Sequence, residues 1–151
     1  MSKNIKGKET RWYSWETEHE GFALQLRYPE KPDFDSLQKL YPKLLTITHV
    51  LSRVQSSGMP ESTYNKSLAD FDHEVIVAFE KSLSGLTVLV ETFGGRRAYY
   101  MYVSAAAPID AMKDRFLKEY PEHELEWELE DNSDWRFIRR YSDDYNLYDK
   151  H

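Results

Sequence analysis

The sequence predicts an α+β fold in which two helices pack on one face of an antiparallel sheet. From residue 43 onward, segments with strand and helix patterns follow in the order strand, helix, strand, strand, helix, strand. The two central strands meet at Gly94 and Gly95, and adjacent glycines can adopt the positive φ angles of a tight hairpin turn. This βαββαβ order is the split βαβ pattern of ferredoxin-like folds, which leaves the opposite sheet face free.

Length and composition predict one domain. The chain has 151 residues, of which 40% are hydrophobic and 15% aromatic, so it can bury a stable core without disulfides or bound metal ions. It contains no cysteine, which excludes disulfides and thiolate chemistry. We expect a disordered N-terminus over residues 1–10, a single α+β domain over residues 11–141 and a polar C-terminal tail over residues 142–151.

The charge balance and the start of the chain disfavour several classes of protein. The 20 basic and 26 acidic residues give a formal net charge of −6, whereas proteins that bind the phosphate backbone are usually basic. The polar start has no apolar run behind it, so we expect neither a signal peptide nor a transmembrane helix. The expected location is the cytoplasm, with no nucleic acid or membrane as partner.

An N-terminal hairpin is expected ahead of the core. Residues 11–29 contain two short alternating runs around Gly21, and apolar residues occupy every second position of the second run. The residues that share this face are Phe22, Leu24, Leu26 and Tyr28. The hairpin could extend the sheet or fold over the face that the helices leave free.

Periodicity places the other elements. Residues 43–53 are rich in β-branched residues and predict a strand. Apolar residues at spacings of three and four predict a helix over residues 60–83, with Gly85 as its left-handed C-cap. A second helix is predicted over residues 105–120. Residues 123–130 predict a strand whose alternating glutamates form a wet, acidic face.

The hairpin over residues 86–103 is the centre of the predicted sheet. A two-residue turn pairs Val90 with Tyr99 and Val88 with Met101. One face is then apolar and comprises Leu86, Val88, Val90, Tyr99, Met101 and Val103. The other face is aromatic with charges near its tip, and it includes Glu91, Phe93, Arg96, Tyr100 and Tyr102. This second face needs either a cover or a ligand.

Several short segments together resemble a known family. In chain order they are Tyr41-Pro42, Gly58-Met59-Pro60, Phe71-Asp72, Gly94-Gly95-Arg96 followed by Tyr99-Tyr100-Met101-Tyr102, and Asp134-Trp135. Over roughly residues 12–141 the pattern is similar to the bacterial domain of unknown function numbered 695 (DUF695), although Asp72 stands where that family often has Glu. Members sometimes accompany a ferredoxin-like domain resembling a regulator of ribonuclease E, so the resemblance implies a regulatory binding role by analogy. It implies no catalytic residues.

The hairpin tip supplies the first candidate site. Arg96 and Arg97 lie there together, with Glu91 two steps down the strand and tyrosines behind them. Paired guanidinium groups beside aromatic rings could bind a phosphate, a carboxylate or an acidic partner segment. The simpler alternative is an exposed turn with cross-strand ion pairs, which contribute only about 0–1 kcal/mol each.

Motifs for catalysis, nucleotide binding and metal binding are missing from the sequence. It contains no GxSxG, GxGxxG or Walker loop, and its five histidines have no zinc-ligand spacing. The alternating glutamates of residues 124–130 are more simply an exposed strand edge than a cation site. We expect no catalytic residue, no metal and no cofactor.

Two functions remain open. The first is a non-enzymatic regulatory module that contacts a protein through the hairpin tip or the free sheet face. The second is a small-molecule binder or enzyme with a site between the N-terminal hairpin and the central sheet. That site would be lined by Trp12, Trp15, Arg97, Tyr100 and Tyr102. A concave pocket favours the second function and a flat exposed patch the first. Either protein could be a monomer or dimerise through an edge strand.

Overall fold

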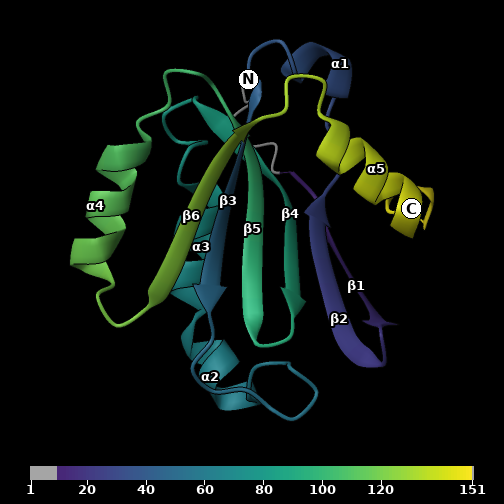
Figure 1. The fold of residues 1–151 in the computed structure, drawn as a ribbon, viewed down its shortest axis with the longest axis vertical. Helices are drawn as coiled ribbons and strands as arrows, with labels where there is room; N and C mark the ends of the chain where they lie inside the picture. The colour runs from purple at the N-terminus through teal and green to yellow at the C-terminus, as the bar shows by residue number, and fades with distance from the viewer. Residues whose placement is uncertain (1–9, 151) are drawn as a thin grey trace, which may run out of the picture.

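One six-stranded antiparallel sheet runs through the computed structural model, which describes residues 10–150 (Figure 1). Its strands are β1 (Trp12–His19), β2 (Phe22–Pro29), β3 (Lys43–Val50), β4 (Gly85–Phe93), β5 (Arg96–Val103) and β6 (Glu124–Asp131), in the order β1-β2-β4-β5-β3-β6. The helices are α1 (Phe34–Leu37), α2 (Ser62–Ser67), α3 (Ala69–Val77), α4 (Ile109–Glu119) and α5 (Arg136–Tyr145), followed by a 3₁₀ turn at Tyr148–Lys150. The predicted α+β class is confirmed. The N-terminus was expected to be disordered over residues 1–10, and residues 1–9 lie outside the described part of the chain.

The N-terminal hairpin extends the sheet and does not cover a face. Strand β2 pairs with β4 from Leu24 to Arg27, so β1 becomes an outer strand. The hairpin turns at Glu20 and Gly21, whose φ angles are 54° and 84°. With these two added strands, the sheet is larger than the four-stranded pattern predicted from residue 43 onward.

Helices α3 and α4 cover one face of the sheet, as the periodicity predicts. Phe71 and Val75 of α3 and Phe116 of α4 are buried against side chains of β3, β4 and β5. The strand residues in this core are Leu45, Ile47, Val90, Tyr99, Met101 and Val103. In Figure 1, α3 lies behind the sheet and α5 in front of it.

The central hairpin has the predicted turn but contains a bulge. Gly94 and Gly95 have φ angles of 60° and 80°, and the Val90–Tyr99 pair is present. The predicted pairing of Val88 with Met101 is wrong, because the register shifts between Thr87 and Leu89 and Met101 lies opposite Thr87. A bulge inserts one extra residue, so side chains before it point to the other face. Leu86 and Val88 therefore pack on the face opposite the helices.

The helix predicted over residues 60–83 is divided and shorter. Leu68, with φ −89° and ψ 0°, separates α2 from α3, and α3 ends at Val77. The left-handed residue is Leu83, with φ 56°, and this residue is 83% exposed. The predicted cap at Gly85 is wrong, since Gly85 begins β4. A Cβ at Gly85 would lie 2.6 Å from the carbonyl oxygen of Tyr102, so close strand approach is what requires glycine here.

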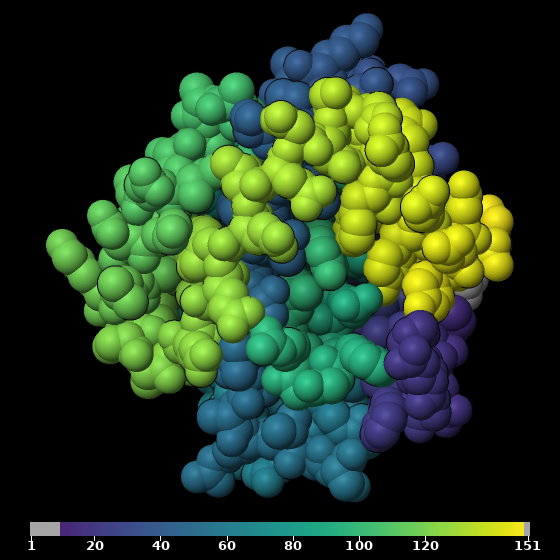
Figure 2. Space-filling view, in the orientation of Figure 1, coloured from purple at the N-terminus to yellow at the C-terminus, as the bar shows by residue number. Residues whose placement is uncertain are grey.

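The C-terminal segment covers the second face of the sheet. Trp135, Ile138 and Leu147 are fully buried against β2, β4 and β5, beside Tyr28 and Tyr102. Figure 2 shows the yellow C-terminal residues lying over this face beside the purple hairpin. The polar tail expected over residues 142–151 is corrected accordingly: α5 continues to Tyr145, and Leu147 belongs to the core.

Candidate functional site

The aromatic sheet face that the sequence singled out is covered by α5 and the residues before it. The ring of Tyr102 stacks on Trp135 with centroids 4.2 Å apart, and the ring of Tyr100 lies 4.5 Å from that of Phe137. The Tyr102 hydroxyl donates a hydrogen bond to Oδ1 of Asn132 at 2.8 Å. The cover that this face needs is therefore supplied by the chain itself.

Glu91 is part of the same covered face. Its carboxylate accepts a hydrogen bond from the hydroxyl of Tyr141 on α5. Burial, and then the charge of Glu91, raise the pKa of Tyr141, which keeps this hydroxyl protonated as a donor. Glu91 thus attaches α5 to the sheet, a role different from the predicted contribution to the hairpin tip.

Arg96 and Arg97 do not form an exposed pair. Arg96 is exposed, and its Nη1 donates to Oε1 of Glu126 at 2.8 Å. Arg97 points to the helix-covered face, where its side chain is only 4% exposed. There it donates from Nε to Oγ1 of Thr92 and from Nη2 to Oδ1 of Asn65, both at 2.9 Å. Adjacent strand residues point to opposite faces, which separates the two guanidinium groups.

Trp12 and Trp15 are also on different sides of the sheet. Trp15 packs on the α5 side, with its ring 6.2 Å from that of Tyr145. Trp12 packs at the edge of the helix-side core. The five residues predicted to line one cleft are thus divided, with Trp12 and Arg97 on the helix side and the other three beneath α5.

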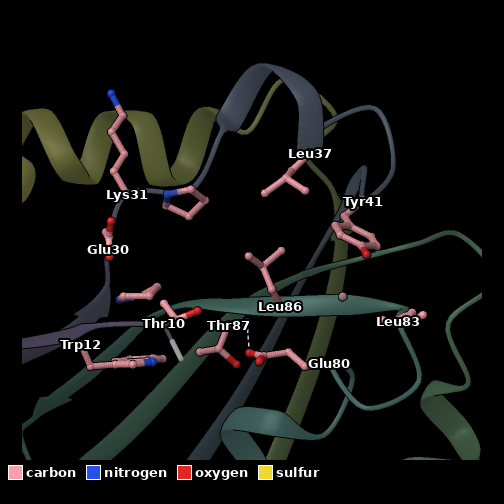
Figure 3. A pocket seen from close by; sticks show the side chains of 13 residues that line it. Thr10, Trp12, Glu30, Lys31, Leu37, Tyr41, Glu80, Leu83, Leu86 and Thr87 are labelled. Atoms are coloured by element: carbon pink, nitrogen blue, oxygen red, sulfur yellow. Dashed lines mark hydrogen bonds between the residues drawn. The ribbon is translucent and has the colours of Figure 1, made fainter. Parts of the chain in front are cut away.

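Trp12 instead lines a cavity of about 600 Å³ at the end of the sheet (Figure 3). We call it the Trp12 cavity. The residues around it come from the start of β1, the end of β2, the start of β4, the α1 region and the segment after α3. They are Thr10, Trp12, Pro29, Glu30, Lys31, Pro32, Leu37, Tyr41, Glu80, Leu83, Gly85, Leu86 and Thr87. Apolar walls with a few polar groups are typical of small-molecule sites.

Glu80 is one of two carboxyl groups that line the Trp12 cavity, beside Glu30. Its Oε2 accepts a long hydrogen bond, 3.4 Å, from the backbone N–H of Thr87, whose hydroxyl donates to the carbonyl of Ile76 at 2.7 Å. Burial raises the pKa of Glu80, and this effect exceeds the opposing hydrogen bond from Thr87 and the charge of His73. In sequence Glu80 reads as an ordinary polar residue near a helix end, and no motif distinguishes it.

We expect Glu80→Gln to stabilise the protein at pH 7. Because the pKa of Glu80 is raised in the folded state, folding binds protons, and the carboxylate costs stability once the pH exceeds its unfolded pKa of about 4.3. Glutamine removes that cost, and the resulting gain in the free energy of unfolding should be less than about 1 kcal/mol because the site is partly exposed. Urea unfolding of wild type and Glu80→Gln at pH 7 and pH 4 measures this gain, which should be absent at pH 4. An equal gain at both pH values would contradict this explanation.

A charged cluster occupies the helix side of the sheet next to Arg97. Asp72 of α3 accepts two hydrogen bonds of 2.8 Å from Arg27 of β2 and one of 2.6 Å from the hydroxyl of Tyr99. Nη1 of Arg97 lies 3.9 Å from Oδ1 of the same carboxylate. Burial acts to raise the pKa of Asp72, but the hydrogen bonds and charges of its partners lower it overall. We call these four residues the Asp72 cluster.

The sequence predictions did not identify the Asp72 cluster. Its members come from β2, α3 and β5, and Arg27 is 45 positions from Asp72. The one signal was the Phe71-Asp72 pair in the family pattern. The chain folds these groups together because α3 packs its apolar stripe on the sheet, which brings Asp72 over β2 and β5.

His49 is a buried histidine on the same face. It is 1% exposed, and its ring packs against Phe71 and His123 with centroids 5.0 and 4.9 Å away. Its Nδ1 makes no hydrogen bond with any described residue. Burial, followed by the charges of His123 and Arg97, lowers the pKa of His49 to about 4. It is therefore neutral at pH 7.

We expect His49 to make the protein less stable as the pH falls from about 6.5 to about 4. The unfolded histidine has a pKa near 6.5, so the unfolded state binds more protons across this window. At about 1.4 kcal/mol per pKa unit, the loss reaches about 3 kcal/mol. The free energy of unfolding, measured with urea at several pH values across this range, should depend clearly less on pH in His49→Phe than in wild type. The control His73→Phe, at an exposed site, should follow wild type. Parallel curves for wild type and His49→Phe would contradict the assignment.

Among residues 10–150, no group of three or more His, Asp or Glu side chains is arranged to hold a metal ion. No helix there has the length and apolar character needed to cross a bilayer.

Comparison with known proteins assigns most of the chain to a protein family. A family of unknown function (DUF695) matches residues 16–141, which include the second half of β1, all of β2 to β6 and the first six residues of α5. No curated protein and no solved structure matches the chain. The matched region contains the Asp72 cluster and most of the Trp12 cavity lining. The chain belongs to the DUF695 family, a family of unknown function.

Proposed function

We propose that this protein binds a small amphipathic organic molecule in the Trp12 cavity. The observation that supports this most directly is the cavity itself: its volume of about 600 Å³ lies within the range of roughly 300–1,000 Å³ typical of ligand pockets. Its walls combine aromatic and aliphatic side chains with polar ones, and one of its carboxyl groups, that of Glu80, has a raised pKa. Such a combination is common at ligand sites.

The chemistry of the walls indicates the class of ligand. In Figure 3, Trp12 lies across the cavity from Leu37 and Tyr41, and Glu80 lies beside Thr87. The aromatic and aliphatic side chains suit a flat or aliphatic body. Glu80 suits a basic amine or another strong hydrogen-bond donor. We therefore propose an arylalkylamine or alkylamine as the ligand class.

The alternative of a protein-docking module has less support. Its two expected surfaces were the aromatic sheet face and a doubly charged hairpin tip. The first is packed under α5, and at the second Arg96 is paired with Glu126 while Arg97 is buried. We also propose that the four strands β4-β5-β3-β6, with α3 and α4, form a ferredoxin-like unit extended by the N-terminal hairpin. That fold hosts many functions, so the proposed function depends on the cavity alone.

Ligand-observed NMR with two matched fragments tests the proposal. Phenethylamine should bind the wild-type chain, and Glu80→Gln should weaken it at least several-fold while changing the binding of neutral 2-phenylethanol little. Trp12→Ala should weaken both fragments, whereas Trp15→Ala, on the opposite face, should leave both unchanged. Glu122→Gln is the control for loss of an exposed carboxylate. No binding to wild type, or binding that Trp12→Ala and Glu80→Gln leave intact, would overturn the proposal.

A further inference from the structure

A second cavity, of about 290 Å³, lies against the Asp72 cluster between β2, β5 and helices α2 and α3. Its lining includes three cationic side chains, Arg27, Lys66 and Arg97, and one carboxylate, Asp72. We propose that this cavity binds a small oxyanion, the phosphate or carboxylate group of a ligand. This site is separate from the Trp12 cavity and does not depend on the function proposed for it.

The carboxylate in this cavity is already fully engaged. Asp72 accepts hydrogen bonds from both terminal nitrogens of Arg27 and from the hydroxyl of Tyr99. Burial raises the pKa of Tyr99 well above its ordinary value, so its hydroxyl remains a donor. One negative charge is thus shared between two guanidinium groups, and Arg27 holds it bidentately.

Arg97 is buried and shares the carboxylate of Asp72 with Arg27. Its Nε and Nη2 donate to the neutral oxygens of Thr92 and Asn65, and its Nη1 is 3.9 Å from Asp72, beyond hydrogen-bond distance. Nη1 makes no hydrogen bond with any described residue. A buried guanidinium that shares its counterion and makes no hydrogen bond to it is incompletely compensated, so an anion that reaches Nη1 from the cavity would be favoured.

Further donors surround the same space. Lys66 of α2 is exposed and forms no ion pair with any described residue, so its ammonium group is available to an incoming anion. Asn65 uses its carbonyl oxygen to accept from Arg97, which leaves its amide N–H groups as donors. Guanidinium groups match the geometry of phosphate and carboxylate oxygens. The excess of positive charge here is local, because the whole chain has a net charge of −6.

The test measures binding of inorganic phosphate and of acetate to the full chain by NMR chemical-shift titration, with sodium chloride at matched ionic strength as the reference. Phosphate, acetate or both should shift the amide signals of Asn65 and Arg97 saturably, where chloride does not. Binding of phosphate alone would identify a phosphate group as the ligand, and binding of both would identify oxyanions in general. Glu80→Gln should leave this binding unchanged, which separates the result from that for the Trp12 cavity.

Variants decide whether the cationic cavity is responsible. Lys66 lies on the surface, so Lys66→Gln should not lower the melting temperature of the free protein. It should weaken anion binding roughly three- to tenfold. Lys113→Gln on α4 is the matched control and should bind as wild type does. Arg97→Gln should abolish binding, and the Lys66 result stands even if that variant folds poorly. A response equal to that of chloride, or one unchanged in Lys66→Gln, would overturn the proposal.

Discussion

Replacing Asp72 with Asn is expected to destabilise the fold by about 3 kcal/mol or more. The substitution preserves the shape of the side chain but removes the negative charge that Arg27 and Arg97 share. Breaking a buried ion pair by removing one partner typically costs about 3–5 kcal/mol, because the remaining charge stays buried without compensation. Here two guanidinium groups would face each other across a neutral amide. Urea unfolding at pH 7 measures the loss directly.

The neighbouring Asp70 provides the matched control. It lies on the same helix but is exposed, so Asp70→Asn should cost less than about 1 kcal/mol. The pH dependence adds a second check. The folded pKa of Asp72 is lowered, so its stabilisation is complete above an unfolded pKa of about 3.9 and is lost as the pH falls through the folded value. The difference between wild type and Asp72→Asn should therefore shrink below about pH 4. A loss no larger than that of Asp70→Asn would show that the cluster does not hold α3 to the sheet.

Replacing Trp135 with Ala is expected to cost about 3–5 kcal/mol, the usual range for a buried tryptophan. Trp135 is fully buried, stacks on Tyr102, and donates from Nε1 to the carbonyl of Tyr41 at 2.8 Å. Its removal leaves a cavity over the sheet and an unpaired carbonyl at Tyr41, two residues before β3. It also loosens the attachment of α5, so the aromatic face should become accessible to hydrophobic dyes.

Trp127→Ala is the control for this prediction. Trp127 is a half-buried tryptophan on the outer strand β6, and its truncation should cost clearly less than that of Trp135. Thermal or urea denaturation compares the two, with dye binding as the second measurement. If Trp135→Ala unfolds with the wild-type midpoint, the C-terminal segment is not part of the stable core.

The correct sequence predictions concern short-range features. The turn at Gly94-Gly95 was predictable because two glycines between β-rich runs favour positive φ values at both positions. The core faces of β2 and β3 follow from strict alternation, and those of α3 and α4 from spacings of three and four. Each of these patterns involves residues close together in the chain.

The errors have identifiable physical causes. Because of the extra residue in β4, Leu86 and Val88 lie on the opposite sheet face from the one predicted. No local sequence feature indicates a bulge there. The C-terminal helix was missed because its apolar stripe is sparse among charged residues. The stripe was nevertheless present, since Ile138, Tyr141 and Tyr145 lie three and four positions apart.

The candidate sites were harder to predict than the fold. Of the seven predicted site residues, Trp12 lines the Trp12 cavity and Arg97 lines the cavity beside the Asp72 cluster, while Arg96 pairs with Glu126. The remaining four, Trp15, Glu91, Tyr100 and Tyr102, pack beneath α5. Glu80 and Asp72, the carboxyl groups that characterise the two cavities, were not among them. Their surroundings come from segments far apart in the chain.

By itself, the sequence determined the α+β class, both hairpin turns, the helix-covered face and the family, because these depend on local backbone preference and on alternation of apolar residues. Only the tertiary structure decided that the second sheet face is covered by the C-terminal segment, where Arg97 points and which groups share a cavity. Those outcomes depend on contacts between distant segments, such as Arg27 with Asp72 and Tyr102 with Trp135. Such contacts arise from the packing of whole elements, and no local pattern encodes their geometry.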